Sequence, residues 1–204
     1  EKIDDVRYIS NFSSGKMANS LAKALYYFGA DITLVASRGY ENLPKNIDIK
    51  VAFSSFKFKQ NIENSLLKTK NKKTFLFMAA AVSDYLPKNK IDGKLKKENL
   101  GETFNLQMVK NIDILASLDK KDIVSVGFKA EMDKEFAKEN AKKMLDNKNL
   151  SAVCLNILDD KNSFGSDRNE IELITKEFSK FFSGDKFLIS FDILDALEKR
   201  FENA

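Results

Sequence analysis

The sequence predicts an α/β protein of three layers, a Rossmann-like fold in which helices cover both faces of a mostly parallel central sheet. Short β-branched runs alternate with amphipathic helical stretches, which is the order of elements that builds a parallel sheet. One run, 75–82, is almost wholly apolar and too short for a helix, as expected of a strand buried on both faces. The 204 residues and a hydrophobic fraction of 43% suit one domain over 1–204.

In the first half of the chain, apolar spacing and breaker residues predict the elements. Leu21, Ala24, Leu25 and Phe28 recur at helical spacing, and Gly29 ends that helix. We therefore expect helices at 17–28 and 56–67, and strands at 32–36, 49–53 and 75–82.

The second half continues the alternation and closes with a β pair and a helix. Strands are expected at 103–109, 123–128, 150–155, 171–175 and 178–182, and helices at 113–118, 135–145 and 185–201. The second of these helices should turn Phe136, Met144 and Leu145 toward the core. Both Pro residues, Pro44 and Pro87, fall in predicted loops.

The composition excludes several kinds of chemistry. The chain has no His, which removes Ser-His-Asp and Cys-His catalysis and His-ligated zinc. Its single cysteine, Cys154, lies in an apolar run and is predicted to be a core residue, and one Cys permits no internal disulfide, so a cytoplasmic location is expected. A net charge of +4 with only four Arg argues against a nucleic-acid partner, and no apolar run is long enough for a membrane span.

The loop after the buried strand carries the most informative residues. Asp84 and Tyr85 come directly after it, and five lysines follow, at 88, 90, 94, 96 and 97. In α/β sheets, ligands bind beyond the carboxyl ends of the strands. Asp84 can hold a neutral polar group or a metal, and the lysines can hold phosphates. The alternative is a solvated, Lys-rich loop.

A polar loop also precedes the first predicted helix. A helix N-terminus offers free N–H groups that suit anions, and Gly15 permits close approach of a ligand. The alternative is that Ser13 or Ser14 only caps the helix. A second helix start follows Lys110, where Asn111 or Asp113 can act as the cap.

Two more motifs complete the set. Gly127 and Phe128 end a buried strand, where an aromatic ring can pack on a planar ligand or belong to the core. The segment 164–169 has the composition of a turn. Together the motifs line one edge of the predicted sheet with anion and ring sites, which indicates a nucleotide ligand.

Six motifs resemble, in the same order, those of the phosphopantothenoylcysteine synthetase family, the ligases of coenzyme A biosynthesis. They are VRYISNFSSGKM at 6–17, AAVSDY at 80–85, KLKK at 94–97, NIDIL at 111–115, GF at 127–128 and FGSDRN at 164–169. The resemblance runs from Glu1 to the last helix. The family's first strand and its GGT turn would precede Glu1, so we expect that this chain lacks them and is cut from something longer.

The resemblance implies a reaction. The carboxylate of 4′-phosphopantothenate attacks the α-phosphate of CTP, and the amine of L-cysteine then attacks the acyl-cytidylate and releases CMP. Such chemistry needs charge neutralisation by Lys, backbone N–H groups and Mg²⁺ rather than a nucleophilic side chain. The family also implies a homodimer, and in bacteria it is commonly fused to a flavin-dependent decarboxylase.

The resemblance also assigns roles to residues. Asn11 should hold the acyl-cytidylate, with Arg7 nearby serving the substrate and Lys94 binding phosphates. The polar loop, Ser14, Gly15 and Lys16, is assigned to substrate binding. The nucleotide contacts are expected from Ala80, Ala81, Asp84, Lys94, from free N–H groups at Ile112, Asp113, Ile114 and Leu115, and from Phe128 and Lys148.

Four positions depart from the family pattern. Met144 stands where the family has a nucleotide-binding Lys, and Ala18 stands where it has Gly. Ile112 replaces Pro, and Lys129 replaces Ala. The contact expected at 144 is the one most affected.

Two other functions fit the same fold class. An NAD(P)-dependent reductase would need a glycine-rich first turn and a Tyr-x-x-x-Lys pair, and neither is visible. A non-catalytic nucleotide-binding module remains the other alternative. Titration with NADPH and CTP separates the first, and an assay of pyrophosphate release decides the second.

Overall fold

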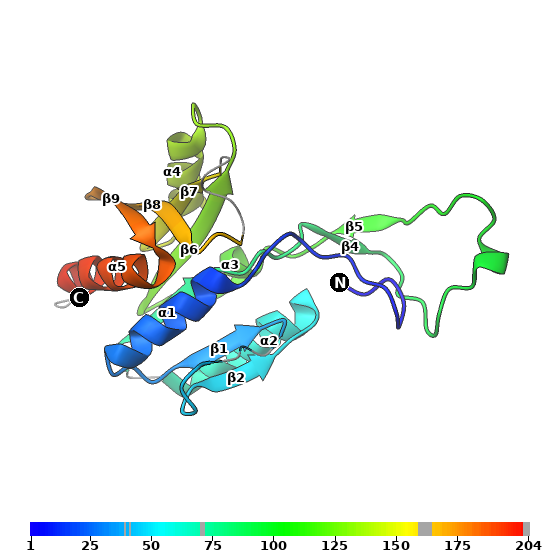
Figure 1. Cartoon of the computed structure of the whole chain (residues 1–204), viewed down its shortest axis with the longest axis horizontal. Coiled ribbons are helices and arrows are strands. Elements are labelled where there is room, and N and C mark those ends of the chain that lie inside the picture. Colours follow the sequence, from blue (N-terminus) through cyan, green and yellow to red (C-terminus); the bar gives the residue numbers. More distant parts are fainter. Residues whose placement is uncertain (39, 41, 70–71, 159–164, 202–204) are drawn as a thin grey trace.

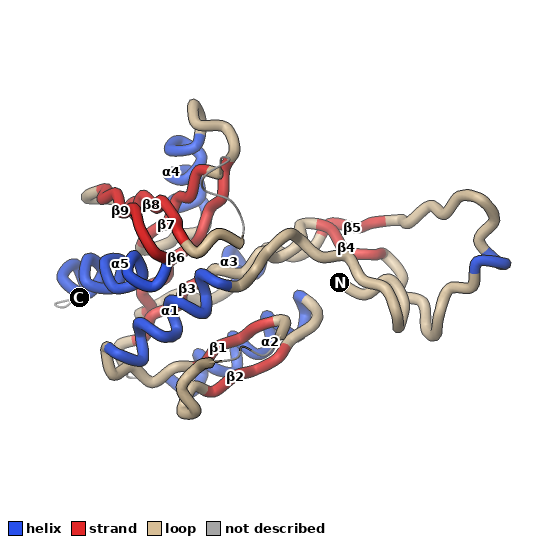
Figure 2. Tube along the Cα trace, viewed as in Figure 1, coloured by secondary structure: helices blue, strands red, loops and turns tan. Residues whose placement is uncertain are grey.

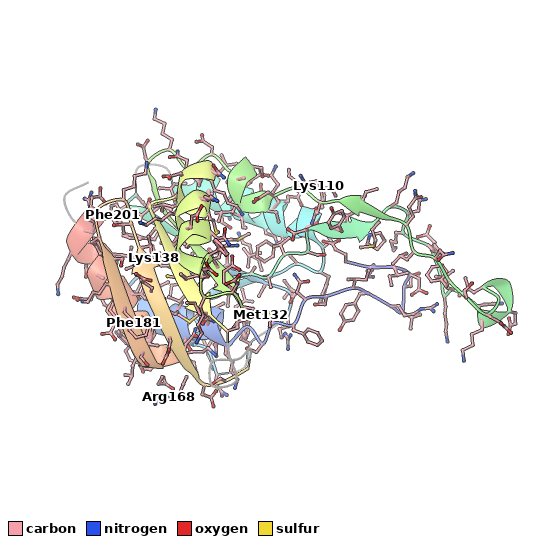
Figure 3. The ribbon with its side chains drawn as sticks, turned by 90° about the horizontal axis from the view of Figure 1, so that it is seen from above. Lys110, Met132, Lys138, Arg168, Phe181 and Phe201 are labelled. Carbon is pink, nitrogen blue, oxygen red and sulfur yellow. The ribbon has the colours of Figure 1, made fainter. Side chains whose placement is uncertain are left out.

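The computed structural model describes residues 1–38, 40, 42–69, 72–158 and 165–201. It consists of a body of helices and strands and a long arm that projects from one side of it (Figure 1). Figure 3 shows Lys110 on the side from which the arm leaves, whereas Phe201 and Phe181 lie at the opposite end of the molecule. No described helix is long and apolar enough to cross a bilayer.

A five-stranded sheet forms the centre of the body, in the order β3-β6-β7-β8-β9. Parallel pairing joins β3 to β6 and β6 to β7, whereas β8 and β9 add to that edge in antiparallel fashion. The strands are β3 (Thr74–Met78), β6 (Ile123–Glu131), β7 (Ala152–Ile157), β8 (Arg168–Ile174) and β9 (Ser179–Asp185).

Helices cover both faces of this sheet, so the body has the three predicted layers. On one face α5 packs with the start of α1 over Val126, Cys154 and Ile171. On the other face α2, α3 and α4 pack over Val153 and Leu155. The helices are α1 (Lys16–Tyr27), α2 (Ser55–Leu66), α3 (Ile114–Ser117), α4 (Ala137–Asn147) and α5 (Lys186–Phe201), with short 3₁₀ turns η1 (Leu67–Thr69) and η2 (Lys97–Asn99). The predicted α/β fold class is therefore confirmed.

A second, smaller sheet lies beside the first. It consists of the parallel pair β1 (Thr33–Ala36) and β2 (Asp48–Val51), set apart from the five strands (Figure 2). Among the described residues, neither the second edge of β1 nor that of β3 pairs with a strand. Between them lies a cavity of about 920 Å³, lined by both strands and by apolar side chains of α1 and α2, such as Leu21, Leu25, Phe58 and Ile62.

The arm is built from two distant parts of the chain. Strand β4 (Tyr85–Pro87) pairs antiparallel with β5 (Met108–Lys110). The N-terminal segment folds back on itself through the bridge between Lys2 and Tyr8. This segment then lies along the loop that follows β4, because the N–H of Ile91 donates to the carbonyl of Ile3.

Most predicted elements match the structure to within a few residues, but four expectations are wrong. Pro87 lies in β4, a short strand that the sequence analysis placed in a loop. The strands predicted at 75–82 and 103–109 are limited to Thr74–Met78 and Met108–Lys110. Phe136 is 50% exposed, because it precedes the first turn of α4 instead of facing the core.

Candidate functional site

The carboxyl end of β3 is where the first two motifs meet. Ala80 and Ala81 follow this strand, and both are exposed. The side-chain Nδ2 of Asn11 donates to the carbonyl of Ala81 at 3.2 Å. These three residues line the mouth of the cavity between β1 and β3, so the polar N-terminal loop lies at the edge of the sheet where ligands bind.

The predicted substrate loop forms the N-terminus of α1. Gly15 is the N-cap and has a φ of 71°, a conformation that favours glycine. A Cβ at this position would lie 2.0 Å from the hydroxyl of Tyr40. The hydroxyl of Ser14 accepts a hydrogen bond from the N–H of Lys16 at 3.3 Å, so the serine closes the turn.

Lys16 is engaged with the last of the sequence motifs. Its ammonium donates to the carbonyl of Gly165 at 2.6 Å and to the carboxylate of Asp167 at 2.7 Å. This contact brings the segment before β8 to the start of α1. Phe164, which belongs to the same motif, lies outside the described residues. The expected role of Lys16 in substrate binding therefore competes with an ion pair.

The buried amide of Asn111, which the sequence analysis considered only as a helix cap, joins three parts of the site. The N–H of Asn111 donates to the carbonyl of Asp84 at 2.7 Å, and its Nδ2 donates to the carbonyl of Ser83 at 2.8 Å. Its Oδ1 accepts from the hydroxyl of Ser55 at 3.2 Å. Asn111 therefore fixes the exposed Asp84 beside the start of α3. Its position within the NIDIL motif was the one sequence signal.

The start of α3 carries an ion pair. Asp113 is the N-cap, and its Oδ1 accepts from the N–H of Ala116 at 3.0 Å. The ammonium of Lys148 lies 2.8 Å from the other carboxylate oxygen. Burial acts to raise the pKa of Asp113, but Lys148 and the Ala116 N–H outweigh it and lower that pKa. The two predicted nucleotide contacts from separate helices thus lie side by side.

The other residues of this motif are less open than expected. The N–H of Ile112 donates to Oδ1 of Asn111 at 2.8 Å, so the expectation of a free N–H group is wrong for this residue. Ile114 and Leu115 are 2% and 3% exposed, and their side chains belong to the core. A ligand at this site can meet their backbone but not their side chains.

Gly127 and Phe128 lie in the middle of β6, which continues to Glu131, so the expectation that they end the strand is wrong. Phe128 is half-buried and packs against the core under α5, together with Met17. On the opposite face, a Cβ on Gly127 would lie 2.6 Å from the methyl carbon of Met144. Met144 therefore fills the core at a position where a nucleotide-binding Lys was expected. Lys129 pairs with Glu131 at 2.9 Å.

Arg7 and Lys94 lie on the arm and are joined through the residue after the lysine. The Arg7 guanidinium forms an ion pair with Asp4 at 2.6 Å and donates to the carbonyl of Leu95 at 2.8 Å. Lys94 itself is exposed. The structure thus brings these two predicted residues together, away from the contact between Asn11 and Ala81.

Two kinds of chemistry can be judged directly. Within the part of the chain that the structure describes, no three His, Cys, Asp or Glu side chains gather into a metal site. Cys154 is fully buried, and burial raises the pKa of its thiol well above the usual range. This confirms its prediction as a core residue, since a buried thiol is a poor nucleophile.

Comparisons with known proteins agree with the motifs. Residues 1–200 match a family described as the DNA/pantothenate metabolism flavoprotein C-terminal domain. The coenzyme A biosynthesis bifunctional protein CoaBC of Vibrio cholerae is 34% identical over 183 residues, which are 87% of this chain and 44% of that protein. The same protein of Haemophilus influenzae is 31% identical over 207 residues, which are 99% of this chain and 50% of that one.

The structural comparison leads to the same group of proteins. The crystal structure of the C-terminal domain of CoaBC superposes with a TM-score of 0.76 at 25% identity, covering 100% of this chain and 91% of that one. The chain spans about half the length of the curated relatives it matches. The resemblance drawn from the six motifs is confirmed, and the chain belongs to the family of the DNA/pantothenate metabolism flavoprotein C-terminal domain.

Proposed function

We propose that this chain is a CTP-dependent ligase that joins 4′-phosphopantothenate to L-cysteine. In the first step a carboxylate oxygen of phosphopantothenate attacks the α-phosphorus of CTP, and pyrophosphate leaves. In the second step the amine of cysteine attacks the acyl carbon of the acyl-cytidylate. The C–O bond to CMP breaks, and the amine loses a proton as the amide forms.

One observation carries the proposal. Four separate segments meet beside the carboxyl end of β3, through Asn11 on Ala81, Asn111 on the Asp84 backbone, and Lys148 on Asp113. All of these residues except Lys148 belong to the motifs shared with the ligases. A site made of amides, carboxylates and ammonium groups suits a reaction whose main need is positioning and charge neutralisation.

The residues can be assigned to these two needs, positioning and charge neutralisation. Asp84 and the start of α3 bind the nucleotide, Lys94 neutralises the triphosphate, and Asn11 holds the acyl-cytidylate. Asn11 can do this because its amide has both donors and an acceptor, and it already lies beside Ala81. No side chain needs to act as a nucleophile, which agrees with a chain without His.

Mg²⁺ would reach the site with the triphosphate. Mg²⁺ in nucleotide sites usually keeps several waters and takes only one or two carboxylates besides phosphate oxygens. The carboxylate of Asp113 is already paired with Lys148, so Asp84 is the better candidate ligand. In that position the ion would neutralise part of the phosphate charge, while the lysines of this chain neutralise the remainder.

A homodimer is part of the proposal, and the arm supports it. The arm and the loops at its base expose large apolar side chains, which include Val6, Tyr8, Phe12, Tyr85 and Ile112. Among these five, Phe12 is the most exposed, at 89%. Exposed apolar groups in one region of a protein can form an interaction surface, and a second copy is the partner that the family implies. Sedimentation should give a dimer for the chain and a monomer for Phe12→Ser; a wild-type monomer would reject this part.

We also infer that the cavity between β1 and β3 accepts one further extended strand. Lys72 lies 3.3 Å from Asp31, which joins the amino ends of the two strands. At the carboxyl ends, the Arg38 guanidinium, which follows β1, donates to the carbonyl of Ser13 in the polar loop. Asn11 in the same loop donates to the carbonyl of Ala81, which follows β3. The two strands are therefore parallel, and the edges that face the apolar cavity pair with no strand in the described part of the chain, as a missing central strand would leave them.

The occupant proposed for the cavity is a segment joined ahead of Glu1. Glu1 lines the cavity, and its carboxylate accepts from the N–H of Ser55 at 2.6 Å, so a strand that runs parallel to β1 would end beside it. Appending the wholly apolar strand Val-Leu-Ile-Val-Val through a short Gly-Ser linker should raise the melting temperature. The same length with a central Pro should not, and equal melting of both fusions would reject the inference.

The function is tested by following pyrophosphate release. The chain is mixed with 4′-phosphopantothenate, L-cysteine, Mg²⁺ and either CTP or ATP. We expect turnover with CTP to exceed that with ATP by ~30-fold or more, which corresponds to ~2 kcal/mol lost when buried polar groups lack a partner. Equal turnover with ATP rejects CTP specificity. CTP binding without pyrophosphate release rejects the ligase and leaves a binding module.

A further inference from the structure

The carboxylate of Asp4 is an unusual feature of the arm. The arm is otherwise open to solvent, yet Asp4 is 1% exposed. A buried carboxylate requires full compensation by donors. Asp4 has that compensation: Oδ1 accepts from the N–H groups of Val6 and Arg7 at 2.8 and 2.6 Å. Oδ2 accepts from Nε and an Nη of Arg7 at 3.0 and 2.6 Å.

The fifth donor to Asp4 comes from the lysine loop. The N–H of Leu95 donates to Oδ2 of Asp4 at 3.0 Å, and the Arg7 guanidinium donates to the carbonyl of Leu95 at 2.8 Å. Both backbone groups of Leu95 are thus held by one ion pair. Since Leu95 follows Lys94 directly, the ion pair fixes the position of the backbone from which the Lys94 side chain extends.

Neighbouring contacts extend the same junction. Asp5 accepts from the N–H of Gly93 at 2.8 Å, and its own N–H donates to the carbonyl of Gly93 at 3.1 Å. Its carboxylate also pairs with Lys90 at 3.3 Å. The segment that makes these contacts continues to Asn11, which is bound to Ala81. One short stretch of chain therefore joins the lysine loop to the edge of the sheet.

We propose that Asp4 and Arg7 form a latch that positions Lys94 for the triphosphate of the nucleotide. Both are positioning residues: Arg7 acts through the backbone of Leu95 and not by touching the nucleotide. The inference rests on the proposed function, because it takes Lys94 as the phosphate-binding residue. It assigns Asp4 a part in the reaction and gives Arg7 a different part from the one that the resemblance implies.

The latch is separable from the stability of the body. The two buried apolar clusters contain residues of the body's helices and strands and none from the segment at 3–7. Loss of the latch should therefore release the loop and leave the body folded. If Arg7 instead acts by contacting the substrate, the loop should stay in place when Asp4 is changed.

The first test measures the loop without any nucleotide. Trypsin cuts after Lys94, Lys96 and Lys97, and mass spectrometry identifies the cuts. In Asp4→Asn the initial rate of cleavage at these sites should rise about tenfold or more, because cleavage follows local opening. Asp195→Asn is the matched control, since it removes a carboxylate that pairs with Lys199 at the surface of α5. It should cleave like the wild type.

The second test measures coupling to Lys94. Asp4→Asn should lower kcat for CTP turnover about tenfold with a smaller change in KM, whereas in a Lys94→Ala background the same change should add little. Arg7→Lys keeps the charge but loses the planar fork, so it should also loosen the loop. It serves as the second variant if Asp4→Asn does not fold.

Two results would overturn the latch. One is cleavage of the loop at the wild-type rate in both Asp4→Asn and Arg7→Lys. The other is full additivity of Asp4→Asn and Lys94→Ala in CTP turnover. Failure of the proposed function looks different: the wild type would show no CTP turnover, while the cleavage assay would still report on the latch.

Discussion

Strand β7 in the body and strand β4 in the arm both pair with a neighbour, but their surroundings have little in common. In β7, Ala152, Val153 and Cys154 are fully buried between two helical layers. In β4, Tyr85 is 55% exposed, and the strand has one partner. Apolar burial determines the structure of the body, whereas hydrogen bonds to the carboxylate of Asp4 and from the amide of Asn111 determine that of the arm and its base. Changes in the two regions should therefore affect different measurements.

The largest effect expected from this contrast is on stability. Ile193 in α5 is fully buried, so Ile193→Ala should lower the free energy of unfolding by about 2–5 kcal/mol. Leu188 in the same helix is 62% exposed, so Leu188→Ala should change the free energy of unfolding by less than about 0.5 kcal/mol. Urea unfolding measures both. Equal losses would mean that the sides of α5 are not as different as their burial indicates.

The next effect concerns the reaction rate alone. Lys94→Ala should slow formation of the acyl-cytidylate roughly a hundredfold, the scale of losing one donor that stabilises developing charge. Its melting temperature should be that of the wild type, because Lys94 is exposed. Lys90 pairs with Asp5 and Asp92 at the surface, so Lys90→Ala should be nearly neutral. If both variants lose activity alike, the lysines act as a diffuse positive field.

A smaller effect is expected at the junction of arm and body. Asn11→Ala should keep CTP affinity but slow the reaction of the intermediate with cysteine by about tenfold, the scale of one lost hydrogen bond to a charged group. Ser10→Ala next to it is the control. A variant that loses ~1 kcal/mol of stability, while the intermediate reacts at the wild-type rate, would make Asn11 a structural residue only.

The smallest effect is on the pH dependence of stability. Hydrogen bonding from Arg7, which outweighs burial, holds the pKa of Asp4 well below its usual range. A carboxyl whose pKa is lower in the folded state stabilises fully above its unfolded pKa of about 3.9 and loses that contribution as pH falls further. From pH 6 to pH 3, Asp4→Asn should therefore lose less unfolding free energy than the wild type. Parallel losses would contradict this.

The same contrast explains how much could be predicted from the sequence. The strands and helices of the body follow from apolar spacing, because burial is what forms them; β7 and α5 were predicted to within two residues. The arm has no such pattern. Pro87 indicated a loop but lies in β4, and the partners that hold it there are distant in sequence.

Prediction of the site had a similar limit. Asn11, Asp84 and Asp113 were found by motif; the structure places Asp84 before β4, Asp113 at the start of α3, and Asn11 in the loop before α1, bound to Ala81. The buried roles of Asn111 and Asp4 depend on partners 28 and 91 residues away, which no local pattern can show. Met144 was predicted to face the core, and the structure confirms this: it fills the space beside Gly127, where the resemblance implied a nucleotide-binding Lys.

The most direct test of the central claim is a single-turnover experiment with labelled CTP and 4′-phosphopantothenate, with and without L-cysteine. The account predicts that pyrophosphate is released in both cases and needs phosphopantothenate, whereas CMP appears only when cysteine is present. Lys94→Ala should slow the first release and Ile193→Ala should not, at a temperature where both are folded. Pyrophosphate release without phosphopantothenate, or CMP release without cysteine, would contradict the proposed acyl-cytidylate and the function built on it.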